Sequence, residues 1–190
     1  SGSNNSGIGI LAAVIHRKVT GNGQYIDISM TDGVMAFNAM TAAAYLAGAP
    51  EPQREQEFLN GGSLYDFYET KDGRYISFGG LEPQFSAAFC RTIGREDLIP
   101  HGIIPPDLEK VKKEIREIFR QKTRDQWTEI FSQVDACVEP VLSLEEAIAD
   151  DNTRVREMIV EFTLPSGEKL KQIANPIKFS ATKQEYRSLG

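Results

Sequence analysis

The sequence predicts a mixed α+β fold, and three observations lead to this prediction. Apolar residues recur at helical spacing in several separate stretches, short alternating runs lie between turn-forming residues, and no internal repeat is present. Of the 190 residues, 41% are hydrophobic and 25% are charged, which is the balance of a globular protein. This length allows one domain or two small lobes that share a core.

The first quarter of the chain predicts two helices with a short strand between them. Residues 6–19 follow helical spacing, with Ser6 as the N-cap and a basic last turn. Two glycines end that helix, and residues 24–29 alternate as a short strand would. Residues 30–46 return to helical spacing and are rich in alanine. The polar residues 48–61, with two prolines, predict a connector.

The middle of the chain predicts a β-hairpin followed by helices. Residues 64–68 and 74–78 alternate on either side of a turn that contains Asp72 and Gly73. Residues 83–93 follow helical spacing and end at a glycine. Two further apolar stripes, at residues 108–119 and 127–134, predict a pair of helices, and Thr123 is placed to cap the second one.

The last third predicts a strand, a short helix and a second hairpin. Residues 136–142 are largely apolar, and they predict a buried strand. Ser143 and Glu146 have the spacing of a capping box, in which each side chain satisfies a free amide of the other residue. Residues 160–179 predict a hairpin around Pro165-Ser166-Gly167, ending in an extended segment at Asn175-Pro176-Ile177.

Composition excludes several classes of function. A net charge of −6 argues against a nucleic-acid partner, because phosphate binding needs a basic surface. No apolar run approaches the roughly 20 residues of a membrane span. Cys90 and Cys137 lie far apart, and we expect two small buried thiols in a reduced cytoplasmic protein. His16 and His101 have no metal-ligand spacing, so we expect no metal site.

Glu82 is the candidate catalytic residue. It follows Gly79 and Gly80 and precedes Pro83, and proline favours the first position of a helix, so Glu82 is expected at the N-cap. The free amides and the positive end of the helix dipole would keep its carboxylate ionised. Such a group can act as a general base or recognise a substrate, or it can simply cap its helix. The residues alone leave both interpretations open.

Gly61 and Gly62 form a second glycine turn, ahead of the first hairpin. Their amides could bind a ligand oxygen, or the turn could be only a flexible entry to the strand. Asp27 and Asp32 are further carboxylates, and Asp32 falls in the first turn of a helix, where an acid is stabilising without any catalytic duty. The sequence contains no P-loop, dinucleotide-binding glycine motif or serine-histidine-aspartate arrangement.

Short segments in order along nearly the whole chain carry a resemblance that no single one would carry. They are Gly9-Ile10-Leu11-Ala12-Ala13, Thr20-Gly21-Asn22-Gly23-Gln24-Tyr25-Ile26-Asp27-Ile28-Ser29-Met30, Asp32-Gly33, Asn60-Gly61-Gly62, Tyr68, Thr70, Asp72-Gly73-Arg74-Tyr75, Gly80-Leu81-Glu82-Pro83-Gln84-Phe85, Asp135-Ala136-Cys137-Val138, Pro140-Val141-Leu142 and Asn175-Pro176-Ile177. As a set they resemble the CaiB/BaiF family, which contains the family III CoA-transferases and α-methylacyl-CoA racemase.

The resemblance implies a fold and an assembly. Members of this family have a large Rossmann-like domain that binds CoA and a smaller domain, and two subunits interlock as a homodimer. Active sites lie between the large domain of one subunit and the small domain of the other. It implies that residues 1–48 are the end of the large-domain helical segment, 49–62 a linker, and 63–190 the small α+β domain with the return segment.

The resemblance also implies site residues and a substrate. Glu82 matches a glutamate near the substrate thioester, and Gly61 and Gly62 match a glycine turn that borders the site. Gly80 belongs to the same motif as Glu82. Glu82 is therefore the expected catalytic residue, and the three glycines are expected to bind the substrate. The family's catalytic aspartate is expected upstream of Ser1, so the 190 residues alone are expected to have little or no activity. The expected substrate is a coenzyme A thioester, with no permanently bound cofactor.

Two chemistries remain open at this point, together with one non-catalytic alternative. A racemase removes and returns the proton α to a thioester and needs two acid/base groups. A transferase uses a carboxylate nucleophile and a site closed to water. The Glu82 motif favours the racemase, but such motifs also occur in transferases. The alternative is a stand-alone binding or dimerisation module.

Overall fold

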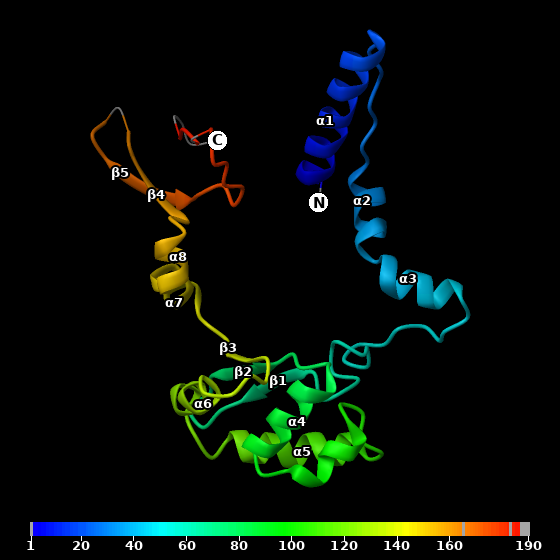
Figure 1. Cartoon of the computed structure of the whole chain (residues 1–190), viewed down its shortest axis with the longest axis vertical. Helices are drawn as coiled ribbons and strands as arrows, with labels where there is room; N and C mark the ends of the chain where they lie inside the picture. The colour runs from blue at the N-terminus through cyan, green and yellow to red at the C-terminus, as the bar shows by residue number, and fades with distance from the viewer. Residues whose placement is uncertain (1, 165, 183, 187–190) are drawn as a thin grey trace. The chain divides into compact units, whose positions relative to one another are not determined.

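The structure is a computed structural model that describes residues 2–164, 166–182 and 184–186. It divides the chain into two compact units at the step from Ser63 to Leu64. The first unit contains the helices α1 (Gly2–Thr20), α2 (Met30–Phe37) and α3 (Ala39–Leu46), and the second contains all the later elements (Figure 1). The three-part division into residues 1–48, 49–62 and 63–190 stays a prediction.

The first unit differs from the expectation at three places. Helix α1 begins at Gly2, so Ser6 lies inside it, where its Oγ donates to the carbonyl of Gly2 at 2.8 Å, and the predicted N-cap is wrong. Residues 24–29 form no strand, because alternation alone cannot form a ladder without a paired partner. The expected helix 30–46 is interrupted at Asn38, whose Nδ2 donates to the carbonyl of Val34 and competes with the helical bonds.

The helices of the first unit bury almost none of their own residues. In the described part of α1, α2 and α3, the one buried residue is Gly33. Many large apolar side chains are instead exposed: Ile8, Ile10, Leu11, Val14, Ile15, Val19, Met30, Val34, Met35, Phe37, Met40, Tyr45 and Leu46. These helices therefore carry apolar surface that exceeds what their own packing covers.

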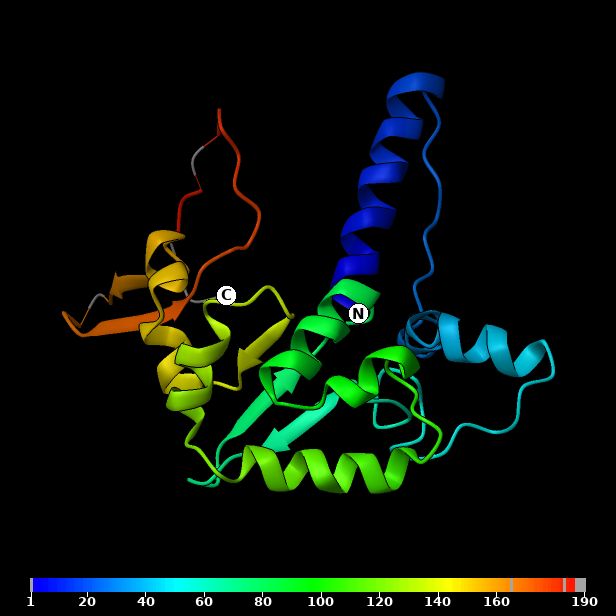
Figure 2. The same ribbon diagram turned by 60° about the horizontal axis from the view of Figure 1, so that its bottom comes forward.

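The second unit is built on a three-stranded antiparallel sheet of β1 (Asp66–Glu69), β2 (Tyr75–Phe78) and β3 (Val138–Pro140), in the order β1-β2-β3. Figure 2 shows β1 and β2 as arrows of opposite direction. The predicted hairpin is confirmed, with Gly73 at a φ of 70° in its turn. The predicted strand 136–142 is shorter than expected, since β3 has three residues.

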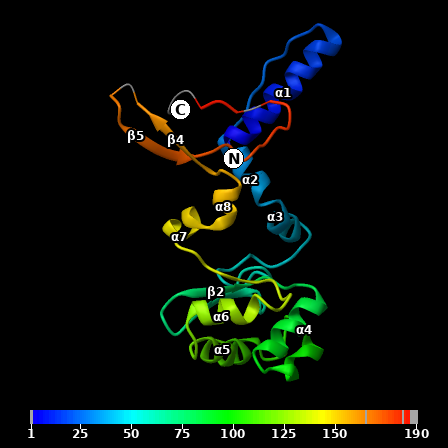
Figure 3. The same ribbon diagram turned by 60° about the vertical axis from the view of Figure 1, so that its left-hand side comes forward.

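Helices cover one face of this sheet. These helices are α4 (Pro83–Thr92), the 3₁₀ helix η1 (Glu96–His101), α5 (Leu108–Phe119) and α6 (Arg124–Phe131). The strands of the sheet lie along one side of this group of helices (Figures 1 and 3). The cap at Thr123 is confirmed as a full capping box with Gln126. The buried residues of this unit form one cluster between the sheet and these helices.

Aromatic rings fill the centre of that cluster. The ring of Phe89 stacks on Phe78 with centroids 3.9 Å apart, and Tyr68 stacks on Phe119 at 5.0 Å. Tyr68 is fully buried, and its hydroxyl donates to the carbonyl of Leu64 at 2.7 Å. Burial raises the pKa of Tyr68 well above its ordinary range, so this hydroxyl remains a neutral donor inside the core.

The other face of the sheet is open. Phe67 on β1 and Tyr75 on β2 are 59% and 45% exposed, whereas their neighbours Tyr68 and Ile76 are fully buried. This alternation follows from the two-residue period of a strand. One face of the sheet therefore builds the core, and the other presents side chains outward.

The remaining elements are α7 (Leu144–Ala149), α8 (Asp151–Val155) and a two-stranded antiparallel sheet of β4 (Ile159–Thr163) and β5 (Lys169–Ile173). The capping box of Ser143 and Glu146 and the second hairpin are both confirmed. Pro165 of the predicted turn lies outside the described residues. No helix among those described has the length and apolar character that crossing a membrane requires.

Candidate functional site

Glu82 occupies the predicted position, the N-cap of α4, with Pro83 as the first helical residue. Its backbone is extended (φ −73°, ψ 145°), and its carbonyl accepts from the amides of Phe85 and Ser86, each at 3.1 Å. Its exposed side chain accepts no capping hydrogen bond from the helix. The local backbone therefore supplies the start of the helix, and the carboxylate of Glu82 is open to an incoming group.

Gly80 allows the turn before Glu82 to pack closely. A Cβ on Gly80 would lie 2.6 Å from Cε2 of Phe78, 2.9 Å from Cβ of Phe85 and 3.1 Å from the carbonyl oxygen of Ala136. Real Cβ atoms do not approach the first two of these distances, so no larger residue fits without a shift. Gly80 is thus required for packing, and its predicted contact with a substrate stays a prediction.

The turn before Glu82 is joined to the segment that leads into β3. The amide of Gly79 donates to the carbonyl of Cys137 at 2.9 Å. The pKa of the Cys137 thiol is raised, first by partial burial and then by the negative charges of Asp135, Glu82 and Glu139. Glu82 therefore lies within electrostatic range of a thiol 55 positions later in the sequence, a juxtaposition that sequence spacing does not indicate.

The prediction of two buried thiols is confirmed for Cys90 and wrong for Cys137. Cys90 is 1% exposed and packs in the core, and burial raises its pKa to about 11. Cys137 is exposed and has a positive φ of 51°, an uncommon conformation for a residue other than glycine. The segment 136–142 was predicted to be a buried strand, but buried and exposed residues alternate at its start, with Ala136 and Val138 buried.

Gly61 and Gly62 belong to the first unit, and Glu82 belongs to the second. Gly61 has a φ of 87°, and a Cβ there would lie 2.5 Å from the carbonyl oxygen of Glu55. The amide of Gly62 donates to the carbonyl of Glu57 at 2.9 Å, so it closes its own turn. The close approach of residues 55–57 accounts for both glycines, and their part in substrate binding stays a prediction.

Sequence reasoning missed an ion-pair network at the end of β3. The guanidinium of Arg124 donates to both carboxylate oxygens of Glu146 at 2.8 Å and to the carbonyl of Val141 at 3.3 Å. Arg74 also pairs with Glu146. The capping box of Glu146 was readable from spacing, but its pairing with Arg124, 22 residues away, was not.

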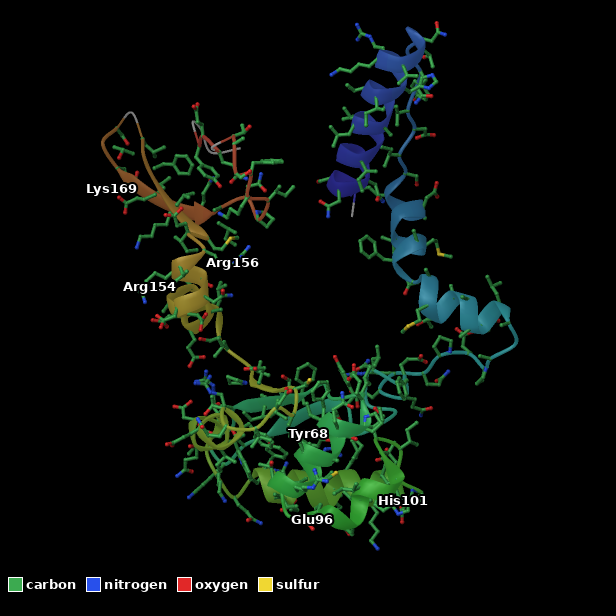
Figure 4. All side chains as sticks on the ribbon, in the orientation of Figure 1. Tyr68, Glu96, His101, Arg154, Arg156 and Lys169 are labelled. Carbon is green, nitrogen blue, oxygen red and sulfur yellow. The ribbon has the colours of Figure 1, made fainter. Side chains whose placement is uncertain are left out.

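Other charged side chains pair on the surface of the later elements. Arg154 pairs with Asp151 at 2.7 Å and Lys169 with Glu161 at 2.8 Å, on α8 and the β4–β5 hairpin (Figure 4). His101 lies at the end of η1 and is exposed. Among the residues that the structure describes, no three histidine, cysteine or acidic residues are grouped so that they could hold a metal ion.

Comparison with known proteins identifies relatives over most of the chain. Residues 2–189 match the profile of CoA-transferase family III. The chain is 34% identical over 155 residues to an α-methylacyl-CoA racemase of Mus musculus, covering 80% of this chain and 41% of the racemase. It is 28% identical over 181 residues to a succinyl-CoA:mesaconate CoA-transferase of Haloarcula marismortui, covering 92% of this chain and 45% of the transferase.

Solved structures support the fold. A CaiB/BaiF family protein from Brucella suis aligns with a TM-score of 0.66 and 21% identity, covering 92% of this chain and 46% of that protein. Rv3272 from M. tuberculosis aligns with a TM-score of 0.69 and 16% identity, over the same shares of the two chains. The chain thus spans less than half the length of these relatives, and the predicted α+β fold is confirmed.

Proposed function

Because the chain belongs to CoA-transferase family III, we propose that it is part of an enzyme that acts on acyl-CoA thioesters. The observation that carries this proposal is the exposed carboxylate of Glu82, at the start of α4 and without a capping hydrogen bond. The alternative of a stand-alone binding module receives no support from the relatives, which include enzymes named for CoA chemistry.

The leading activity is exchange of the proton α to the thioester, as in a racemase. Glu82 would accept the α-proton on its carboxylate while the electron pair of the broken C–H bond moves toward the thioester carbonyl oxygen. Return of a proton to the opposite face of the carbanion then inverts the carbon. The second acid/base group and the donors to the enolate oxygen would come from the remainder of the enzyme. The chain has a higher sequence identity to the racemase than to the transferase, which supports racemisation as the first candidate.

CoA transfer is the second candidate, supported by the longer alignment with the transferase. Here a carboxylate would attack the thioester carbonyl, release CoA as the thiolate and form an anhydride. The free thiolate would attack the enzyme's own carbonyl of the anhydride, which releases the donor acid and leaves a thioester between the enzyme carboxyl and CoA. The carboxylate of the acceptor acid would then attack this thioester and release the thiolate again, with formation of a second anhydride. Attack of the thiolate on the acceptor carbonyl of that anhydride would give the new acyl-CoA and free the enzyme carboxylate. In this chemistry the α-proton of the acyl group is never removed.

Solvent exchange separates the two activities. The full-length enzyme would be incubated with a 2-methylacyl-CoA in heavy water, with no acceptor acid, and deuterium at the α-carbon measured by mass spectrometry. A racemase incorporates deuterium, and a pure transferase does not. Glu82→Gln is expected to lower the exchange rate by about 10²-fold or more.

The matched control is Glu96→Gln, an exposed glutamate on η1 (Figure 4). This variant is expected to catalyse exchange of the α-proton at the wild-type rate. If Glu82→Gln keeps wild-type turnover in both the exchange assay and a CoA-transfer assay, Glu82 has no catalytic role. Loss of α-proton exchange in Glu82→Gln, with exchange retained in Glu96→Gln, supports Glu82 as the acid/base group.

We further propose that the complete protein is a homodimer and that these 190 residues alone have little activity. The large exposed apolar side chains of α1, α2 and α3 support an assembly in which other protein surface covers them. Sedimentation of the full-length protein is expected to give a dimer. A clean monomer at high protein concentration contradicts the homodimer.

A further inference from the structure

We propose that Arg124, through its pair with Glu146, positions the carboxylate of Glu82 for the reaction. This inference rests on the function proposed above and adds a residue that acts on the same site from a distance. Arg124 is a positioning residue and is assigned no contact with the substrate. The connection runs through β3, which is held by Arg124 at one end and by the turn before Glu82 at the other.

The first end of β3 holds the turn that carries Glu82. The amide of Gly79 donates to the carbonyl of Cys137 at 2.9 Å. A Cβ on Gly80 would lie 3.1 Å from the carbonyl oxygen of Ala136, so this turn packs directly on the segment that leads into β3. A displacement of β3 would therefore move the backbone that supports the turn, and Glu82 caps the helix that follows it.

β3 is a short strand with limited support along its length. It has three residues and lies at the edge of the sheet, next to β2. An edge strand is hydrogen-bonded to the sheet on one side. A cavity of about 400 Å³ also lies beside β3, lined by all three of its residues and by Phe131 of α6. The position of β3 therefore depends on the contacts at its two ends.

Arg124 supplies contacts at the far end of β3. One terminal nitrogen of its guanidinium donates to the carbonyl of Val141 at 3.3 Å, one residue beyond the strand. The amide of Val141 donates to the carbonyl of Tyr75 on β2 at 2.9 Å. The backbone amide of Arg124 donates to Oδ1 of Asp72 at 3.1 Å, so the arginine is itself fixed to the turn between β1 and β2. Arg124 thus ties the end of β3 to the hairpin.

Glu146 holds the guanidinium in the orientation that reaches Val141. Two hydrogen bonds of 2.8 Å, one to each oxygen of the Glu146 carboxylate, fix the plane of the guanidinium. Asp125 also accepts from this group, at 3.1 Å and 2.9 Å, but the Asp125 side chain is 82% exposed, whereas that of Arg124 is 10% exposed. Without the Glu146 carboxylate, the guanidinium is expected to follow Asp125 toward solvent and to lose Val141.

The test measures turnover of 2-methylbutanoyl-CoA by the full-length enzyme, in whichever of the exchange and transfer assays the wild type supports. Glu146→Gln is expected to lower kcat by about tenfold and to leave KM within about twofold, because a displaced acid/base group slows the reaction more than it weakens binding. Arg124→Lys keeps the positive charge but cannot make the two-point contact, and the same loss is expected. Each variant is assayed well below its unfolding transition.

The matched control is Glu114→Gln, which removes a carboxylate from another shielded arginine. Glu114 on α5 accepts from Arg95 at 2.7 Å, and the side chain of Arg95 is 18% exposed. Arg95 also keeps a second carboxylate partner, Asp97, as Arg124 keeps Asp125. This pair joins the start of η1 to α5. Glu114→Gln is therefore expected to keep the kcat and KM of the wild type.

Hydrogen exchange of the Gly79 amide gives a readout that does not depend on activity. This amide is protected by its bond to the carbonyl of Cys137. Glu146→Gln is expected to speed its exchange by about tenfold, and Glu114→Gln is expected to leave it at the wild-type rate. Mass spectrometry with fragmentation to single amides measures this rate in the full-length protein.

The outcomes separate this inference from the proposed function. Wild-type kcat in Glu146→Gln and Arg124→Lys, or an equal loss in Glu114→Gln, overturns the inference and leaves the proposed function standing. A rise in KM at unchanged kcat, or unchanged exchange at Gly79, does the same. Wild-type turnover in Glu82→Gln, or no turnover by the wild type in either assay, overturns the proposed function and this inference with it.

Discussion

Arg124 and Glu146 form a two-point ion pair, with each carboxylate oxygen of Glu146 2.8 Å from a different terminal nitrogen of the guanidinium. The same arginine begins α6, where its backbone amide donates to Asp72 in the hairpin turn at 3.1 Å. Glu146 also accepts from the amide of Ser143 at 2.8 Å. One pair therefore joins the hairpin, α6 and α7, and it fixes the chain that leaves β3.

The stability of this junction is expected to depend on acid pH. Hydrogen bonds from Arg124 and then from Ser143 hold the pKa of Glu146 far below its ordinary value. Because the folded-state pKa is lowered, the stabilisation is fully present above the unfolded-state pKa of about 4.3 and is lost as the pH falls further. Glu146→Gln should destabilise the protein at pH 7, and the difference from wild type should shrink steadily below about pH 4.

Urea unfolding at a series of pH values measures this effect, followed through the fluorescence of Trp127, the one tryptophan of the sequence. Glu145→Gln is the control, since Glu145 lies in the same first turn of α7. A difference between wild type and Glu146→Gln that stays constant from pH 7 down to pH 2.5 would contradict the assignment.

Phe89 is expected to be the most sensitive aromatic residue of the core. It is fully buried, and its ring lies 3.9 Å from Phe78 and 6.1 Å from both Phe119 and Phe131. Phe89→Ala should lower the free energy of unfolding by about 3–5 kcal/mol, through lost burial and the cavity left behind. Phe67→Ala, on the open face, should change it by less than about 1 kcal/mol. Similar losses in the two variants would argue against the described core.

Asp66 is paired with a buried lysine. Nζ of Lys112 lies 2.6 Å from Oδ2 of Asp66, and the lysine side chain is only 3% exposed. Asp66→Asn weakens the partner of a buried charge and should cost about 3 kcal/mol in the free energy of unfolding. Asp107→Asn makes the same chemical change at an exposed helix N-cap and should be nearly neutral. Equal effects of the two substitutions in urea unfolding would contradict the buried pair.

Gly80 and Gly79 should respond differently to a methyl group. Gly80→Ala places a Cβ 2.6 Å from Phe78 and is expected to cost about 1–3 kcal/mol in the free energy of unfolding and to displace Glu82. Gly79→Ala meets the ring of Tyr65 at an ordinary contact distance of 3.4 Å and should be mild. Unfolding midpoints and the heavy-water exchange rate of the two full-length variants test this order. If Gly79→Ala is the more damaging, the packing described for the turn is wrong.

Local signals in the sequence determined much of the second unit. The turn at Asp72-Gly73, the capping boxes that begin at Thr123 and Ser143, and the position of Glu82 before Pro83 all depend on residues within a few positions of one another. Each could therefore be predicted. The 24–29 segment failed because a strand exists only when a distant partner pairs with it, and alternation does not specify that partner.

The surroundings of Glu82 were decided by tertiary structure. Its neighbours Asp135, Cys137 and Glu139 come from a segment more than 50 residues away. That segment leads into β3, which pairs with β2 in a register that places Glu139 opposite Ser77. The pairing of Arg124 with Glu146 likewise depends on how α6 and α7 approach each other. The sequence alone determined which helix holds the carboxylate. Only the fold determined which charges stand beside it, because electrostatic neighbours depend on distance in space and not on spacing along the chain.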